Sequence, residues 1–125
     1  MMAARVFRLG RKGWLERNFA ELKRLEAQNP KYLQVRRYRG RPDTYDIRIK
    51  GRGKFRRYKL HLRCTWSTPS IPPKFILVNR REIASANHPH ITEIYACLKV
   101  PWTPNMSLAS IVETIKEVWW NPKEL

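Results

Sequence analysis

Three side chains with nucleophilic, basic or metal-binding chemistry lie close together in "HPHITEIYACLKVPWTP", residues 88–104. Cys97 can serve as a nucleophile or a ligand, and His88 and His90 can accept a proton or bind a metal ion. A structural zinc site usually takes four Cys or His ligands, and no obvious fourth ligand follows Cys97. A Cys–His catalytic pair needs a partner that orients the histidine, and the chain supplies no clear one. These residues alone leave both chemistries open.

Helical patterns flank this stretch on both sides. Residues 14–28 carry apolar side chains at helical spacing, and the pattern ends at Asn29 because a residue before proline avoids the helical region. Residues 108–120 show a second apolar stripe. The apolar positions are Leu15, Phe19, Leu22 and Leu25 in the first range, and Leu108, Ile111, Val112, Ile115, Val118 and Trp119 in the second. We predict an amphipathic helix over each range.

Between these helices the apolar period changes from helical to alternating. Apolar and polar residues alternate over 32–38, 44–50 and 58–66, and a short apolar run at 75–79 follows a proline-rich connection. A period of two indicates a strand with one buried face. Cys64 falls on the buried side of the third strand, and we expect it to pack as a small apolar residue.

The segment from Arg80 to Pro104 has no regular pattern, and it contains the stretch around Cys97. A loop of about 25 residues within a compact domain is usually functional. The predicted order is helix, four-stranded antiparallel meander, irregular segment and helix, within a single domain over residues 1–125. We therefore predict an α+β fold in which the two helices cover the apolar face of the sheet.

The chain is strongly basic, with 26 Lys and Arg against 10 Asp and Glu and a formal net charge of +16. Much of this charge lies between Arg36 and Arg63, where the only acids are Asp43 and Asp46. The stretch is a solvated sheet face, a docking face for an acidic protein or a phosphate-binding surface. No run is apolar enough to span a membrane and the N-terminus lacks a secretory signal, so we expect a cytoplasmic protein without membrane association.

The order of landmarks along the chain resembles the ubiquitin-conjugating enzyme family. That family has an N-terminal helix, a four-stranded meander, a proline-rich turn, a His-Pro-Asn motif, a thioester cysteine followed by leucine, a Trp-x-Pro turn and a core helix. The corresponding segments here are "TPSIPPK" (68–74), "HPH" (88–90), "CL" (97–98) and "WTP" (102–104). The resemblance covers the core at residues 14–122 and implies the ubiquitin-conjugating fold.

By this resemblance Cys97 is the catalytic cysteine, which holds the C-terminus of a ubiquitin-like protein as a thioester. His90 stands where the family has asparagine, and its implied role is to donate a hydrogen bond to the oxyanion during transfer. The residues that correspond to the supports of the active-site loop are His88, Pro89, Trp102 and Pro104. The resemblance implies no cofactor and no metal.

The loops around Cys97 are shorter than is usual in the family, and with Leu125 as the last residue we expect the family's later helices to be missing. These features resemble minimal bacterial members of the family in antiphage operons (CBASS), which modify a cGAS-like nucleotidyltransferase at its C-terminus. The implied partners are an activating enzyme or its equivalent, and either a ubiquitin-like modifier or that nucleotidyltransferase. An acidic protein surface is a further expected partner for so basic a chain.

A function of a different class also fits the composition. Tyrosines are interleaved with arginines in "VRRYRGR" (35–41) and "KFRRYK" (54–59), which suits phosphate contacts and base stacking. The alternative is therefore a small basic nucleic-acid-binding module without catalysis, although no zinc-knuckle, RRM or helix-turn-helix signature accompanies the charge. An inactive member of the fold that only scaffolds is a third alternative, and the presence of Cys97 argues against it.

Overall fold

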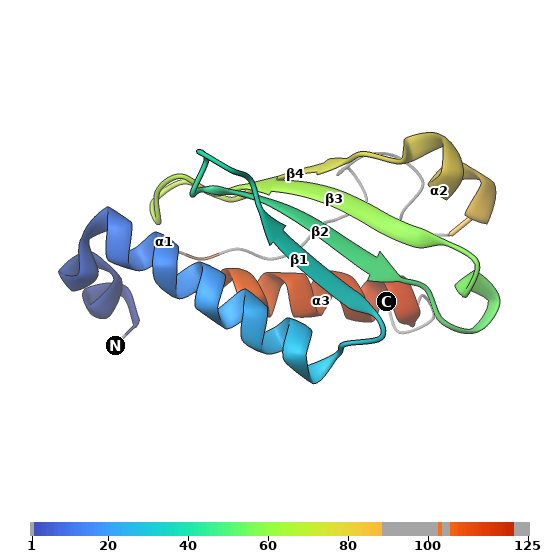
Figure 1. Ribbon diagram of the computed structural model, residues 1–125, viewed down its shortest axis with the longest axis horizontal. Helices are drawn as coiled ribbons and strands as arrows, with labels where there is room; N and C mark the ends of the chain where they lie inside the picture. The colour runs from blue at the N-terminus through green and yellow to red at the C-terminus, as the bar shows by residue number, and fades with distance from the viewer. Residues whose placement is uncertain (1, 89–102, 104–105, 122–125) are drawn as a thin grey trace.

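A computed structural model describes residues 2–88, 103 and 106–121, and the side chains of this part from residue 10 onward. The strands form one antiparallel sheet in the order β1-β2-β3-β4, so each strand pairs with its neighbour in sequence (Figure 1). The elements are α1 (Met2–Gln28), β1 (Leu33–Arg37), β2 (Thr44–Lys50), a 3-10 turn (Gly53–Phe55), β3 (Lys59–Thr65), β4 (Lys74–Leu77), α2 (Arg80–Ala86) and α3 (Leu108–Trp120). The predicted α+β class and the four-stranded antiparallel meander are confirmed.

The first helix is longer than the predicted one and bends at Gly10. It begins at Met2, whereas the sequence pattern begins at residue 14, and Gly10 has non-helical angles of φ 66° and ψ 177°. Glycine adopts a positive φ without the steric cost of a Cβ atom, so two helical segments join there. At the other end the Asn29 side chain donates to the Leu25 carbonyl at 3.0 Å, which satisfies one of the last carbonyls of the helix.

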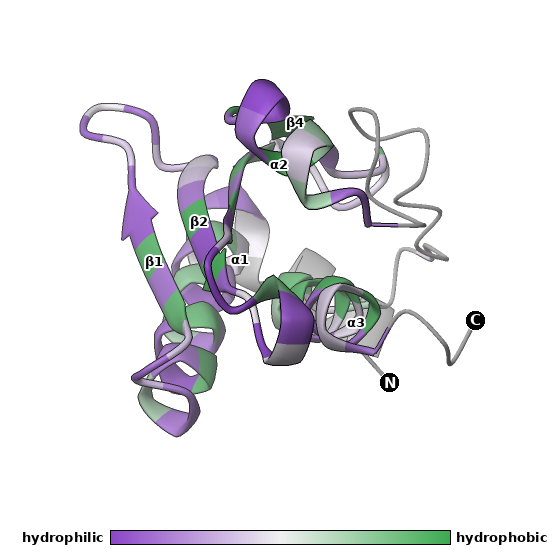
Figure 2. Ribbon diagram, turned by 90° about the vertical axis from the view of Figure 1, so that its right-hand side faces the viewer, coloured by the Kyte–Doolittle hydropathy of each residue, from purple (hydrophilic) through white to green (hydrophobic). Residues whose placement is uncertain are grey.

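Alternation along the strands divides the sheet into an apolar face and a charged face. In β3 the side chains of Leu60, Leu62 and Cys64 are buried, while those between them are exposed or half-buried. The registers carry this pattern across the sheet, because Leu62 pairs with Ile47 on one side and with Leu77 on the other. Figure 2 shows the resulting change of hydropathy from residue to residue along the strands.

Two helices cover the apolar face, as predicted. α1 and α3 lie next to each other on this side of the sheet (Figure 1). Leu22 of α1 and Ile111 and Ile115 of α3 are buried there. Trp14 of α1 packs edge-on against Trp66 after β3, with ring centroids 4.9 Å apart. Burial of apolar surface is the dominant favourable contribution to folding, so this layer carries the stability of the domain.

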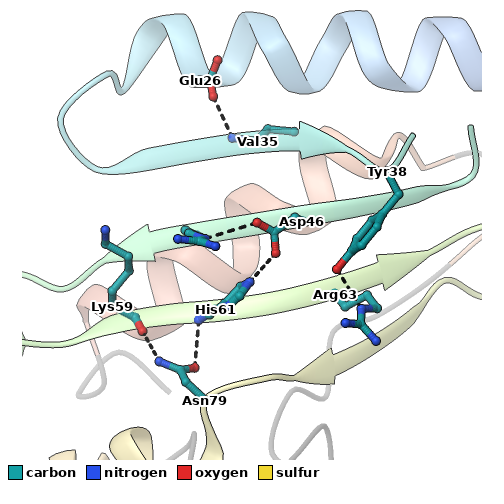
Figure 3. A network of polar contacts seen from close by, with 9 residues as sticks. Glu26, Val35, Tyr38, Asp46, Lys59, His61, Arg63 and Asn79 are labelled. Atoms are coloured by element: carbon teal, nitrogen blue, oxygen red, sulfur yellow. Dashed lines mark hydrogen bonds and ion pairs between the residues drawn. The ribbon is translucent and has the colours of Figure 1, made fainter. Parts of the chain in front are cut away.

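Side chains of α1 also protect the outer edge of β1. The Val35 N–H donates to Glu26 at 2.7 Å, and the Val35 carbonyl accepts from Lys23 at 3.3 Å (Figure 3 shows the first contact). Lys23 and Glu26 form an ion pair at 2.6 Å. An edge strand with open backbone groups can pair with another chain, and these two side chains satisfy one residue of that edge.

The segment that starts at Arg80 is not irregular throughout, and this corrects the prediction. Arg80–Ala86 form α2, which lies beyond the end of β4 (Figure 1). Its one buried side chain is Ile83, so these seven residues lack the repeated apolar spacing from which a helix is predicted. The helix ends at Asn87, whose positive φ of 55° is one that asparagine tolerates.

Candidate functional site

Most of the predicted site lies outside the described residues, so the roles assigned to it stay predictions. The predicted site residues in the ranges 89–102 and 104–105 are Pro89, His90, Cys97, Trp102 and Pro104. The structure does place the residues that flank them. His88 is the last residue described before the first range, and Ser107 precedes α3 after the second.

His88 is a buried packing residue. It is 0% exposed and lies beside the rings of Phe55 and Trp119, with ring centroids 4.7 Å and 5.2 Å away. Phe55 and Trp119 are themselves stacked at 5.3 Å. Ring pairs at these separations gain energy beyond the burial of their area. We call these three residues the His88 cluster.

The imidazole of His88 also holds the end of α3. Its Nε2 atom lies 3.2 Å from the carbonyl oxygens of Val118 and Trp119. A carbonyl can only accept, so Nε2 carries a proton and donates it. The last carbonyls of a helix have no donor within the helix, so His88 supplies one. His88, the last described residue before the 89–102 range, is thereby tied to the C-terminal turn of α3.

The chain between β2 and β3 positions the His88 cluster against the sheet. A Cβ atom at Gly51 would collide with the Phe55 carbonyl, so glycine lets this connection close tightly around Phe55. Trp119 donates its indole N–H to the Ile49 carbonyl at 3.1 Å, at the end of β2. Phe55 and Trp119 are therefore both fixed by contacts at or just after the end of β2.

The other flank is held by an N-cap. The Ser107 hydroxyl accepts from the Ser110 N–H at 3.1 Å, which satisfies one of the unpaired donors at the start of α3. Leu108, the first residue of the helix, is 0% exposed. The range that includes Cys97 is therefore flanked by fixed residues at the two ends of α3, a helix of 13 residues.

Cys64 is a core residue, as predicted. It is 0% exposed in β3, where the registers place Tyr45 on one side and Phe75 on the other. Burial disfavours the thiolate and raises the pKa of the Cys64 thiol far above its ordinary value. A thiol that is inaccessible and protonated cannot act as a nucleophile. Of the two cysteines, only Cys97 remains a candidate.

Sequence reasoning missed a polar cluster on the charged face of the sheet. Asp46 of β2 accepts from Arg48 Nε at 3.2 Å and contacts Nε2 of His61 in β3 (Figure 3). The His61 backbone N–H donates to the side-chain oxygen of Asn79 at 3.1 Å. The side-chain amide of Asn79 in turn donates to the Lys59 carbonyl of the same strand at 2.6 Å. Alternation alone predicts that Asp46 and His61 face outward, but only the strand register shows that they meet.

Metal binding finds no support in the described part of the chain. No group of three or more His, Cys, Asp or Glu side chains lies close enough there to hold a metal ion. A metal site that used Cys97 as a ligand would lie outside the described residues. No helix in the described ranges is long and apolar enough to cross a membrane.

Comparison with known proteins assigns the chain to no family. No protein-family model matches the sequence, and no curated protein matches it significantly. The class that the fold defines is an α+β domain, in which an N-terminal helix and α3 cover one face of an antiparallel meander.

Proposed function

We propose that this protein is a thioester carrier of the ubiquitin-conjugating type. Cys97 accepts the activated C-terminus of a ubiquitin-like protein, or of a partner cGAS-like nucleotidyltransferase, and passes it to an amine. An activating enzyme or its equivalent supplies the acyl group. We place this activity in bacterial antiphage defence on the resemblance of the landmarks alone.

The observation that carries the proposal is the order of the landmarks on an α+β fold. The helix, the four-stranded meander and the final helix occur in the order that the family shows, with "HPH", "CL" and "WTP" between β4 and α3. A parallel sheet, or helices on opposite faces of the sheet, would have removed this support. The ubiquitin-conjugating arrangement of the whole domain is part of the proposal.

The fixed residues on both sides of the Cys97 range give the proposal a second support. His88 bonds to the last turn of α3, and Ser107 caps the first turn of the same helix. A helix of 13 residues is about 20 Å long, at 1.5 Å per residue. Reactive side chains work best when rigid elements hold the segment that presents them.

The chemistry requires two acyl transfers at one sulfur atom. The Cys97 thiolate attacks the activated carbonyl, the activating group leaves with the bonding electrons, and a thioester forms. The acceptor amine then attacks the thioester carbonyl and loses a proton, and the Cys97 thiolate departs. Both steps pass through an oxyanion, and a preorganised donor at that position contributes about 3–4 kcal/mol. We assign that donor role to His90.

Trapping variants test the proposal directly. Wild type, Cys97→Ser and Cys97→Lys are captured from native cells and run on non-reducing gels, and the adducts are identified by mass spectrometry. Wild type is expected to carry an adduct that both a thiol reagent and hydroxylamine remove. The serine variant is expected to carry an ester that survives the thiol reagent, and the lysine variant an amide that survives both.

The matched control is Cys64→Ala, which removes the other thiol of the chain. Because Cys64 is buried, this variant is expected to keep the wild-type adduct. Hydroxylamine separates a thioester from a disulfide, since it cleaves the first and leaves the second intact. An adduct that is lost in Cys64→Ala and kept unchanged in Cys97→Ser contradicts the assignment.

A further inference from the structure

The charged face of the sheet carries a dense group of cations. These side chains alternate with the buried ones along each strand, so the strand registers fix their positions. Among them only Arg48 has a carboxylate within ion-pair distance in the described part of the chain. The cations that we call the basic face are Arg36 of β1, Arg48 and Lys50 of β2, Lys59 and Arg63 of β3 and Lys74 of β4.

Among the described residues, the one carboxylate at the centre of the basic face is that of Asp46 (Figure 3). It contacts Arg48 at 3.2 Å and also His61. The registers place Arg36 directly opposite Asp46 on one side, and Arg63 directly opposite on the other. One negative charge cannot balance the arginines of three strands, so an excess of positive charge remains.

Like charges also meet without any acid between them. Lys50 of β2 and Lys59 of β3 are direct partners in the register, an arrangement that destabilises a sheet. Asp43, the other acid of the 36–63 stretch, lies at the opposite end of β2, where it contacts the Ser67 hydroxyl at 2.6 Å and Arg11 at 3.7 Å. A bound polyanion would relieve this repulsion, so the basic face gains most from a ligand with repeated negative charges.

A depression of about 320 Å³ opens on the basic face. Tyr38 reaches from the end of β1 across β2, and its hydroxyl accepts from Arg63 Nε at 2.9 Å (Figure 3). The lining includes Arg36, Tyr38, Arg39, Asp46, Arg48 and His61. Its volume is at the lower end for small-molecule sites, which suits one nucleotide unit.

We propose that the basic face binds single-stranded nucleic acid, with backbone phosphates on the arginines and one base in the depression beside Tyr38. The planar guanidinium group matches two phosphate oxygens at once. An aromatic ring stacks with any base, so binding of this kind has little sequence preference. A duplex keeps its bases paired and cannot place one against Tyr38. The inference is independent of Cys97 and goes beyond thioester transfer.

An acidic protein is the competing ligand, and its affinity would come largely from exposed apolar side chains at and around β4, where Ile76 is the register partner of Arg63. Ile76 and Val78 are 38% and 41% exposed, and Ile71 before β4 is 61% exposed. A protein partner gains affinity by burying such side chains, whereas phosphates gain nothing from them. None of the three lines the depression, which lies over β1, β2 and β3. The position of the depression therefore favours nucleic acid.

Fluorescence anisotropy with a labelled single-stranded oligothymidine tests the inference, with the matching duplex and polyglutamate as competitors. Wild type is expected to bind the single strand, with an affinity that falls as salt rises. Arg36→Ala is expected to lower the slope of log affinity against log salt by about 0.7. Tyr38→Ala is expected to weaken binding about tenfold, and Tyr38→Phe to leave it nearly unchanged.

Two further variants make the outcome decisive. Arg24→Ala removes an exposed arginine of α1, on the helix-covered side of the domain, and is expected to keep the wild-type salt slope. Ile76→Ser is expected to bind the oligonucleotide as wild type does. An equal loss of affinity for the oligonucleotide in Arg24→Ala and Arg36→Ala would show that binding depends only on net charge, and it would overturn the inference. Competition by polyglutamate at the same concentration as the oligonucleotide, with loss of binding in Ile76→Ser, would assign the face to an acidic protein and also overturn it.

Discussion

The two faces of the sheet are built from alternate residues of the same strands, yet one is apolar and buried and the other is charged and exposed. Leu62 faces inward and is 0% exposed, while its neighbour Arg63 faces outward, donates to the Tyr38 hydroxyl at 2.9 Å and lies over the Tyr38 ring. The inner face gains stability by excluding water from apolar surface. The outer face instead retains cations that repel one another. One face of the sheet can therefore supply the stability of the fold, while the other face stays accessible for binding a ligand.

The first prediction concerns the two neighbouring residues Leu62 and Arg63, each replaced by alanine in turn. Leu62→Ala is expected to lower the free energy of unfolding by about 2–5 kcal/mol, because it leaves a cavity between Ile47 and Leu77. Arg63→Ala, the matched control one position along, is expected to change it by less than about 0.5 kcal/mol. Urea unfolding followed by tryptophan fluorescence measures both. Equal losses in the two variants would contradict the assignment of stability to the inner face.

A second prediction concerns Asp43, which joins the hairpin between β1 and β2 to the chain after β3. The hydrogen bond from the Ser67 hydroxyl, supported by that from the Thr44 hydroxyl and by the charge of Arg11, holds the pKa of the Asp43 carboxyl below its ordinary value. The resulting stability is present above the ordinary pKa and is lost as the pH falls through the lowered one. We expect Asp43→Asn to cost about 1–2 kcal/mol at neutral pH.

The pH dependence of that difference is the informative measurement. Wild type loses the contribution below about pH 4, so the unfolding free energies of wild type and Asp43→Asn are expected to converge in acid. Thermal unfolding over a series of pH values follows the convergence. A difference that stays constant down to the acid end would mean that the Asp43 charge contributes nothing.

A third prediction concerns Asp46→Asn on the outer face, whose expected effect is smaller than those of Leu62→Ala and Asp43→Asn. The substitution removes the one carboxylate among Arg36, Arg48 and Arg63 and leaves their repulsion unrelieved. We expect a loss of about 0.5–1 kcal/mol at low salt, which shrinks as salt screens the arginines. Urea unfolding at low and high salt gives both values. A loss independent of salt would indicate a packing role for Asp46 instead.

The regular elements follow from short-range patterns, which is why the sequence predicts them. The nine alternating residues at 58–66 and the apolar stripe at 108–120 each repeat a period often enough to identify β3 and α3. α2 has one buried residue, Ile83, and thus no period to detect. The start of α1 at Met2 was missed for a related reason, since Gly10 interrupts the helix before the apolar stripe begins.

The candidate sites depend on contacts between distant parts of the chain, which local patterns do not contain. His88 is adjacent in the sequence to neither Phe55 nor Trp119, and only the packed domain brings the three rings together. The contact of Asp46 with His61 likewise depends on a strand register. Cys64 was correctly predicted as a core residue because alternation within one strand is enough to bury it.

The central claim is that Cys97 carries an acyl group, and peptide mapping of the native protein tests it most directly. Wild type isolated from native cells without reductant is digested, and the peptide that contains Cys97 is measured by mass spectrometry before and after hydroxylamine. We predict a Cys97 peptide that bears the C-terminal residues of another protein and returns to its unmodified mass on treatment. A Cys97 peptide that is always unmodified, while the partner proteins are present and active, would contradict the claim.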